Sequence, residues 1–346
     1  MPSLIKTPAG TFAVKFRVNG KQIKRTFKFK KDAQQFIATI TLKPEAKQSR
    51  ILVSGLFRTY LKEVTPKHRG AHNEACRIER ILRSAAWTQK TVDKLRPSDI
   101  QAYLDSRLSG KGRALGTTVG AATILREVKT IRAVWHWAMR KGFVSHNPTI
   151  ALALPKEPEH RERIADKEDI DRLLIACAWD GKTVPADLKQ LVVCAFLFAC
   201  ETGMRAGEIL QIEAGWIDGR IIHLPAEATK TCLKRDVALS KEAVRLLELA
   251  NNHDARFPYF SRFSNATRDA HFRIVRERAG LGAEKDSQGR VVKEGLNFHD
   301  SRATFATRAA KKMDVLSLAR LTGHRDLKML QRYYREPVEE LAKKLD

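Results

Sequence analysis

The sequence predicts a multidomain, mainly α-helical chain with small β-sheets, and three observations support this fold class. The 346 residues exceed the length of a usual single domain. Apolar and basic residues alternate near the N-terminus, whereas most later segments show helical spacing. A polar, proline-bearing stretch at residues 154–169 is typical of a linker. We expect a small basic sheet with one helix at residues 1–46, a four-helix bundle at 51–155 and a mixed α/β domain at 160–346.

The first region is predicted to form a basic β-hairpin. Residues 11–29 alternate apolar and basic side chains on both sides of Asn19-Gly20, a dipeptide that favours a two-residue hairpin turn. A helix is expected directly afterwards, in KKDAQQFIATI. Residues 1–46 contain ten basic and two acidic residues, so ten minus two gives this region a formal charge of +8.

A small basic sheet of this kind can enter the major groove of DNA. The alternative is a solvated strand face whose lysines discourage edge-to-edge aggregation. The candidate DNA-binding residues of this sheet are Lys15, Arg17, Lys24, Arg25 and Lys28.

The second region is predicted to be a bundle of four helices, near residues 51–63, 71–85, 98–108 and 119–141. Pro97 and the residues after it give a start signal for the third helix, and the glycine-bearing stretch SGKGRALG separates it from the fourth. The fourth helix is expected to stop at Gly142 and the following NPT.

The third region begins near residue 160 and is predicted to be mixed. Helices are expected at 167–177, 188–200 and 206–212, with a break at Gly203. The apolar run within the second of these helices is about half the length needed to cross a bilayer, so no membrane span is expected. Short strands are expected around Asp218-Gly219 and in TKTCLKRDVALS, and the remainder is predicted to be mainly helical.

The formal net charge of +25 points to a polyanionic partner, and nucleic acid is the leading candidate. A merely basic surface, or a protein at a membrane surface, is the alternative. The N-terminus lacks the pattern of a secretory signal, and the five cysteines form no paired motif. We therefore expect a reducing cytoplasm, no zinc site and cysteines that are small buried apolar residues.

Two motifs in the third region suit an anion. Arg205 follows a glycine turn at a predicted helix start, where its guanidinium and the helix dipole both face an anion. His299 and Arg302 are three residues apart, which on a helix places them on one face. Guanidinium and imidazole together fit phosphate oxygens. Taken alone, each motif is also compatible with an ion pair or a helix cap.

The stretch LTGHRDLKMLQRYYRE adds His324 and, nine positions later, Tyr333. A tyrosine is a useful nucleophile only where cations stabilise its phenolate and the reacting phosphorus. No acidic cluster surrounds these positions, so we expect charge stabilisation by side chains, with no metal and no cofactor.

The ordered set of Arg205 in TGMRAGEI, Lys230 in ATKT, His299 and Arg302 in HDSR, His324 in LTGH and Tyr333 in RYY resembles the tyrosine recombinase family, of the phage integrase type. The resemblance extends over most of residues 51–340. The basic N-terminal sheet is similar to the arm-type DNA-binding domains of phage integrases, which is a less specific match.

The resemblance implies a role for each of these residues. Arg205 and Arg302 would hold the nonbridging oxygens of the scissile phosphate, His324 would donate a further hydrogen bond, and His299 would assist proton movement at the nucleophile. Lys230, on a hairpin loop, would protonate the departing 5′-hydroxyl, and Tyr333 would form a 3′-phosphotyrosyl bond. Glu208 would orient the site. Lys234 and Arg235 lie on the same predicted hairpin and are the alternatives to Lys230.

The adjacent Tyr334 is the alternative nucleophile, although neighbouring helical residues point about 100° apart and only one can face the phosphate. The resemblance also implies double-stranded DNA with core and arm-type attachment sites as partner, a homotetramer on DNA, a host DNA-bending protein and an excisionase, in the bacterial cytoplasm at the nucleoid. The C-terminal PVEELAKKLD has helical spacing and could pack on its own domain or on a neighbouring protomer.

Three hypotheses about the function follow. The first is a site-specific recombinase that integrates and excises a mobile element. A type IB topoisomerase-like strand transferase would share the same chemistry. A non-catalytic DNA-binding remnant of the fold is the third, and the complete set of predicted site residues argues against it.

Overall fold

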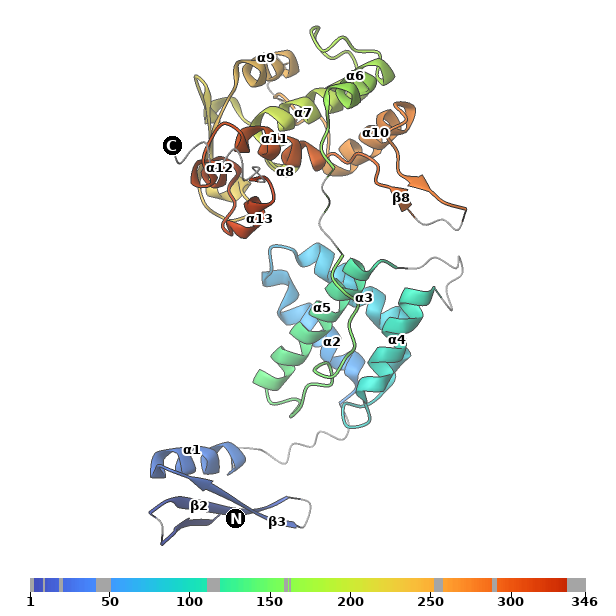
Figure 1. Ribbon diagram of the computed structural model, residues 1–346. Coiled ribbons are helices and arrows are strands. Elements are labelled where there is room, and N and C mark those ends of the chain that lie inside the picture. The colour runs from blue at the N-terminus through green and yellow to red at the C-terminus, as the bar shows by residue number, and fades with distance from the viewer. Residues whose placement is uncertain are drawn as a thin grey trace, which may run out of the picture. The chain divides into compact units, whose positions relative to one another are not determined.

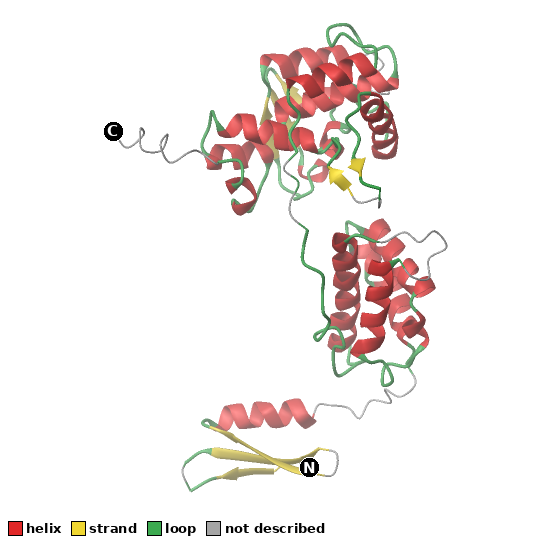
Figure 2. Cartoon of the chain, turned by 45° about the vertical axis from the view of Figure 1, so that its right-hand side comes forward, coloured by secondary structure: helices red, strands yellow, loops and turns green. Residues whose placement is uncertain are grey.

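The computed structural model describes residues 3–8, 10–18, 21–41, 51–110, 119–158, 161, 163–251, 258–287 and 291–334. The chain divides into two compact units, residues 1–159 and 160–346 (Figure 1). The predicted mainly α-helical architecture with small antiparallel sheets is confirmed. In the described part of the chain, the strands form two three-stranded sheets and one two-stranded sheet, and helices make up most of the residues (Figure 2).

The N-terminal sheet contains strands β1 (Ser3–Lys6), β2 (Phe12–Val18) and β3 (Lys21–Phe27), in the order β1-β2-β3. Val18 pairs with Lys21, which is the register of a two-residue hairpin loop, so the predicted hairpin is confirmed although its turn lies outside the described residues. Helix α1 (Lys30–Thr41) follows it, and the Phe36 ring packs against the rings of Phe16 and Phe27. Strand β1 is an addition to the sequence prediction.

The next four helices match the predicted positions closely. They are α2 (Val53–Glu63), α3 (Ala71–Ser84), α4 (Pro97–Ser109) and α5 (Ala121–Arg140), with short 3-10 helices at Thr65–Lys67 (η2) and Ala86–Gln89 (η3). Their apolar faces meet in one core, in which Phe57 contacts the rings of Trp87 and Trp135. Most of the loop between α4 and α5 lies outside the described residues.

The second unit is built around one apolar helix. This helix, α7 (Leu188–Thr202), has ten buried residues and packs against helices on several sides, which explains its nearly continuous hydrophobic sequence. The surrounding helices are α6 (Lys167–Ala176), α8 (Ala206–Ile209), α9 (Lys241–Ala250), α10 (Asn265–Arg278) and α11 (Asp300–Ala310). Helices α12 (Val315–Thr322) and α13 (Lys328–Gln331) complete the described chain.

The second unit has a three-stranded sheet, which packs against α12 through its last strand. The sheet consists of β4 (Ile217–Asp218), β5 (Ile221–Leu224) and β6 (Arg235–Ala238), in the order β4-β5-β6. Short 3-10 helices precede and follow the first hairpin, at Ala214–Trp216 (η4) and Ala226–Ala228 (η5). These strands confirm the two predicted strand regions.

Several details differ from the sequence predictions. Helix α8 is only one turn long. It ends at Ile209 with Leu210 as its C-cap residue, whereas the sequence predicted a helix to residue 212. A hairpin of β7 (Glu284–Lys285) and β8 (Val291–Lys293) was not expected. Cys177, Cys194 and Cys200 are buried as predicted, whereas Cys76 and Cys232 are exposed. The predicted C-terminal helix at residues 337–346 lies outside the described residues.

Among the described residues, no helix is both long enough and apolar enough to span a bilayer.

Candidate active site

Arg205 is positioned by the turn between α7 and α8. Gly203 ends α7 with a left-handed conformation, φ +64°, and Arg205 becomes the N-cap residue of α8. Its backbone N–H donates to Glu208 Oε2 at 2.8 Å, and its Nη1 donates to Glu208 Oε1 at 2.8 Å. The ion pair is therefore built into the start of the helix and is not a surface pair, because Glu208 is only 2% exposed.

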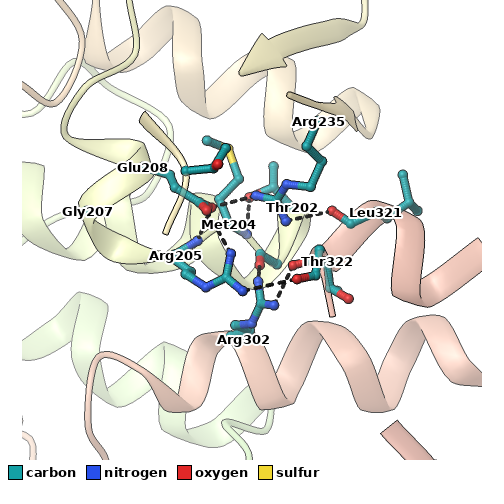
Figure 3. Close-up of polar contacts among 12 residues, drawn as sticks. Thr202, Met204, Arg205, Gly207, Glu208, Arg235, Arg302, Leu321 and Thr322 are labelled. Carbon is teal, nitrogen blue, oxygen red and sulfur yellow. Dashed lines mark hydrogen bonds and ion pairs between the residues drawn. The ribbon is translucent and has the colours of Figure 1, made fainter. Parts of the chain in front are cut away.

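Glu208 also binds a second arginine, Arg235 of β6. Arg235 Nη2 donates to Glu208 Oε2 at 2.5 Å, and Arg235 Nη1 donates to the Leu321 carbonyl at 3.0 Å (Figure 3). Burial is the main cause that lowers the pKa of Arg235, and the nearby Arg205 adds to it, while Glu208 acts in the opposite direction. One buried carboxylate thus joins two guanidinium groups that belong to different elements.

Arg302 lies in the first turns of α11 and is 5% exposed. Its Nη1 donates to the Gly203 carbonyl, and its Nη2 donates to the Thr322 carbonyl (Figure 3). Burial, followed by the positive charges of Arg205 and Arg235, lowers the Arg302 pKa to about 9. A negatively charged ligand would oppose the second of these causes, because it adds countercharge to a cluster in which one carboxylate, Glu208, is shared by two arginines.

His324 directly follows the left-handed Gly323 that ends α12. The Thr322 hydroxyl lies 2.6 Å from the Leu318 carbonyl, which can only accept, so the hydroxyl hydrogen points there. The same hydroxyl oxygen lies 2.7 Å from His324 Nδ1. We therefore assign the hydrogen of the neutral imidazole to Nδ1, which leaves a lone pair on Nε2.

The surroundings of His324 disfavour its protonation. Arg302 Nη2 lies 3.4 Å from Nε2 and 3.5 Å from Nδ1 of the imidazole. Burial, and then the charges of Arg302, Arg205, Arg332 and Arg235, lower the pKa of His324 to about 3. In the chain without DNA, His324 is therefore neutral at pH 7.

His299 is the N-cap residue of α11 and has right-handed helical backbone angles, and its carbonyl accepts from the Arg302 N–H at 3.1 Å, so the two residues lie one turn apart. Its side chain is exposed, whereas Arg302 is buried. Desolvation by surrounding protein atoms, followed by the charge of Arg302, lowers the pKa of His299. A neutral imidazole at the edge of the arginine cluster can accept a proton from a reacting group.

Lys230 lies between η5 and β6 and is exposed, as is Lys234. The structure records no side-chain hydrogen bond for Lys230 within the described part of the chain, which leaves its ammonium group available to a ligand. Arg235, the other alternative on this hairpin, points into the protein instead. The adjoining loop is tied to the histidine turn, because Arg325 Nη2 donates to the Thr231 carbonyl at 3.0 Å.

The two tyrosines follow α13 and lie in a turn, so the helical geometry expected for them is replaced by turn geometry. Tyr334 donates its hydroxyl hydrogen to the Met313 carbonyl at 3.0 Å. The Tyr333 hydroxyl instead accepts from Arg332 Nη2 at 3.0 Å, and Tyr333 is close enough to Arg302 for a phenolate there to raise the Arg302 pKa. Tyr333 therefore lies beside the arginine cluster, whereas Tyr334 is bound to the loop before α12.

The structure separates the candidate DNA-binding residues of the N-terminal sheet. Lys15 pairs directly with Lys24, and Arg17 pairs with Gln22, so these backbone positions share one face. Arg25 is on the other face, where its guanidinium lies 5.0 Å from the centroid of the Phe36 ring of α1. Lys28 lies beyond the end of β3, with its ammonium 5.8 Å from the Phe29 ring centroid.

A pocket of about 350 Å³ lies between the β6 hairpin and the end of α12. It is lined by basic groups that include Lys234, Arg320, Arg325 and His324. A larger pocket of about 910 Å³ is lined by residues such as Trp216 and Tyr259 and contains none of the predicted site residues. Among the described residues, no group of three or more His, Cys, Asp or Glu side chains is placed to hold a metal ion.

Sequence reasoning did not assign a role to Arg235 or Thr322. The alternation in β6 offered a signal for Arg235, because Val237 and Leu239 are two and four residues later and are both buried. An arginine in phase with them points inward. Thr322 gave no comparable signal, because its contact with His324 depends on the left-handed turn at Gly323.

Comparisons with known proteins agree with these features. The sequence profile described as the Phage integrase family matches residues 163–340, which is more than half of the chain. A shufflon-specific DNA recombinase of Escherichia coli is 27% identical over 311 residues, which cover 88% of this chain and 74% of the relative.

Solved structures show the same fold. A lambda integrase dimer bound to a COC′ core site has a TM-score of 0.64 and 17% identity, with 97% of both chains covered. A lambda integrase tetramer bound to a Holliday junction has a TM-score of 0.62 and 17% identity, with 94% of this chain and 96% of that chain covered. With its profile match, its fold and its cluster of arginine, histidine and tyrosine side chains, this chain belongs to the phage integrase family.

Proposed function

We propose that this protein is a site-specific DNA recombinase that cleaves and rejoins DNA strands through a 3′-phosphotyrosyl intermediate, in the integration and excision of a mobile element. The observation that carries the proposal is the convergence of Arg205, Arg302 and His324 at the end of α12, with Tyr333 beside them. This arrangement offers guanidinium and imidazole groups to one phosphate and an aromatic hydroxyl to attack it.

The arginines supply the charge stabilisation. The pentavalent transition state carries more negative charge on its nonbridging oxygens than the phosphodiester does, so fixed cations favour it over the ground state. Arg205 and Arg302 are already held by carbonyl and carboxylate partners and do not need to reorganise during the reaction. His324 donates a further hydrogen bond to a nonbridging oxygen once Nε2 has taken up a proton.

The remaining groups move protons. The Tyr333 hydroxyl loses its proton as its oxygen bonds to phosphorus, and His299 accepts it, because a pKa below the ordinary value keeps the imidazole neutral at pH 7. The bond from phosphorus to the 5′-oxygen breaks, and Lys230 gives a proton to that oxygen. One phosphoester bond forms as one breaks, so the 5′-hydroxyl of a second strand can reverse the reaction and release Tyr333.

DNA is the proposed partner at two kinds of site. The second unit with the helical bundle binds the core site, and the N-terminal sheet binds an arm-type site. The direct pairing of Lys15 with Lys24 supports the latter, since like charges directly opposite each other destabilise a sheet and a polyanion would relieve the repulsion. Four protomers would act on two duplexes in the cytoplasm at the nucleoid, with a host DNA-bending protein and an excisionase as further partners.

A trapping experiment tests the proposal. Duplexes are selected by binding to the full chain from a random-sequence pool, nicked at successive positions on one strand and incubated with protein in EDTA. A nick next to the cleavage site lets the short 5′-hydroxyl fragment leave, so the covalent adduct accumulates. We expect a slowly migrating band on denaturing gels with wild type and Tyr334→Phe, and none with Tyr333→Phe.

Other outcomes would change the assignment. Loss of the adduct in Tyr334→Phe alone would make Tyr334 the nucleophile. If neither wild type nor either variant forms an adduct on DNA that the protein binds, the result would support a non-catalytic DNA-binding protein. Adducts without strand exchange between two duplexes, but with relaxation of supercoiled plasmid, would support a topoisomerase-like activity.

A further inference from the structure

The end of α12 is held by three arginines from three different elements. Arg235 Nη1 donates to the Leu321 carbonyl, Arg302 Nη2 to the Thr322 carbonyl and Arg205 Nη2 to the Gly323 carbonyl. These are consecutive carbonyls at a helix C-terminus, where the unpaired oxygens and the helix dipole both attract cations. Each carbonyl therefore fixes the direction of a different guanidinium.

Arg235 lines the pocket beside His324, but most of its side chain is enclosed by protein. Its side chain is 7% exposed, and both Nη atoms are engaged, one with Glu208 and one with Leu321. Its Nε is also enclosed, and it has no hydrogen-bond partner among the described residues. The bonds to Glu208 and Leu321 use two of the five N–H donors of Arg235, and the low exposure of its side chain limits the access of a DNA phosphate to the others.

The contacts of Arg235 nevertheless reach three parts of the proposed phosphate site, namely Arg205, the histidine turn and the Lys230 loop. Through Glu208 it is joined to the backbone N–H and the guanidinium of Arg205. It also packs against the turn before His324, because a Cβ on Gly323 would come within 3.0 Å of Arg235 Cδ and Nη1. Arg235 begins β6, the strand that follows the Lys230 loop.

We infer that Arg235 is a positioning residue, which joins the Lys230 hairpin, the Glu208 carboxylate and the end of α12 so that Arg205, Arg302 and His324 face one phosphate. This inference rests on the proposed function. Without Arg235, Glu208 Oε2 keeps only the Arg205 N–H as a donor, and the Leu321 carbonyl loses its side-chain partner. The arginine pair and the histidine turn then lose their shared anchor.

The test compares variants of the full chain. Arg235→Met removes the charge and all donors, and Arg235→Lys keeps the charge but can reach only one of the two partners at a time. Arg220→Met is the matched control, since Arg220 lies at the other end of the same sheet, where its Nε and Nη2 donate to the Leu239 carbonyl. Cleavage of the nicked duplex is measured at saturating protein, and affinity for the same duplex is measured by fluorescence anisotropy.

We expect Arg235→Met to slow single-turnover cleavage by about tenfold to a hundredfold, the scale of a small misplacement of reacting groups, and to change Kd by less than about threefold. Arg235→Lys should fold and cleave at an intermediate rate, and Arg220→Met should cleave like wild type. Cleavage by Arg235→Met at the wild-type rate overturns the inference. A loss of affinity as large as the loss of cleavage rate shows a binding role instead. If Arg235→Met does not fold, wild-type cleavage by a folded Arg235→Lys overturns the inference.

Hydrogen exchange separates this inference from the proposed function. Arg235→Met should raise amide exchange in peptides covering residues 231–239 and 319–325, with little change in α9 and α10, and Arg220→Met should leave residues 319–325 unchanged. If wild type forms no adduct on DNA that it binds, the proposed function fails, and the exchange result still decides whether Arg235 holds these segments. Unchanged exchange in Arg235→Met overturns the positioning role.

Discussion

At the scale of single residues, the site is defined by which groups have a partner and which remain open. Arg235 and Glu208 are buried and paired, whereas Arg205 and His324 are partly open and beside one another. The Tyr334 hydroxyl donates to a backbone carbonyl, whereas the Tyr333 hydroxyl accepts from a neighbouring guanidinium, and both rings pack against the apolar cluster of α11, α12 and α13. These differences favour Tyr333 as the reacting tyrosine in a sequence that contains both side by side.

The protonation of His324 gives a prediction. Its pKa is lowered to about 3, so the folded chain without DNA keeps it neutral, while an unfolded chain titrates near pH 6.5. The contribution of neutral His324 to stability is therefore present above about pH 6.5 and is lost as the pH falls toward 3. A DNA phosphate between the arginines would add negative charge that opposes their effect, and we expect it to raise the pKa of His324.

We therefore expect DNA binding at pH 7 to take up protons, up to about one per site, from the solvent. Isothermal titration calorimetry in two buffers with different ionisation enthalpies measures this uptake. His324→Gln should reduce it, because an amide does not titrate. Equal uptake by wild type and His324→Gln would assign the protons to other groups.

At the scale of secondary-structure elements, two helix ends with left-handed glycines build the site. Gly203 ends α7 and presents its carbonyl to Arg302, and Gly323 ends α12 and presents its carbonyl to Arg205. Both turns change the chain direction within one residue, which places the last carbonyls toward the arginines. The functional side chains are thus oriented by helix ends and not by helix faces.

Gly203→Ala should destabilise the second unit. A Cβ at this position would come within 2.4 Å of Phe305 Cδ1, and the residue keeps φ +64°. The positive φ costs about 1–2 kcal/mol for alanine, and the overpacking adds about 1–3 kcal/mol. Thermal melting measures the loss. Gly207→Ala is the control, since nothing lies within 4 Å of its added Cβ in α8, and a similar loss there would contradict the explanation.

The N-terminal sheet gives a second prediction at this scale. Lys24→Thr removes a like charge directly opposite Lys15, so the sheet should gain about 0.2–1 kcal/mol. The same change should weaken DNA binding and reduce the slope of log K against log salt by about one. Arg25 lies on the face toward α1, so Arg25→Thr should remove the contact of its guanidinium with the Phe36 ring and lower the stability of the sheet and helix. It should leave the salt slope of DNA binding unchanged. Equal slopes in wild type and Lys24→Thr would place the DNA on another surface.

At the scale of the whole molecule, the charge is the dominant property. The formal net charge is +25, and the N-terminal region contributes +8 of it while the second unit supplies the arginine cluster. Such a chain binds DNA largely through phosphate contacts that release counterions. Each contact is weak in salt, and their number sets the salt dependence.

We expect affinity for a selected duplex to fall by about 10³- to 10⁵-fold between about 50 mM and about 200 mM salt, as for proteins with six to ten phosphate contacts. Anisotropy titrations over this range measure the slope. A change of less than about tenfold would show that few phosphates are contacted, which contradicts a DNA-binding surface spread over both units.

The sequence by itself determined the order of the elements and the types of the reacting groups. Helical spacing, the Asn19-Gly20 turn and the terminators at Gly142 and Gly203 act over a few residues, so the positions of α2 to α7 and of the N-terminal hairpin follow from local patterns. Ordered short motifs were enough to single out Arg205, His299, Arg302, His324 and Tyr333 as candidates.

Only the tertiary structure decided how these groups are held. Arg235 meets Glu208 across 27 residues and Leu321 across 86 residues of sequence, and such contacts depend on how separate elements pack. The burial of Arg302, the tautomer of His324 and the placement of both tyrosines outside a helix have the same origin. Local spacing fixes backbone conformation, but the environment of a side chain is set by segments that are distant in the chain.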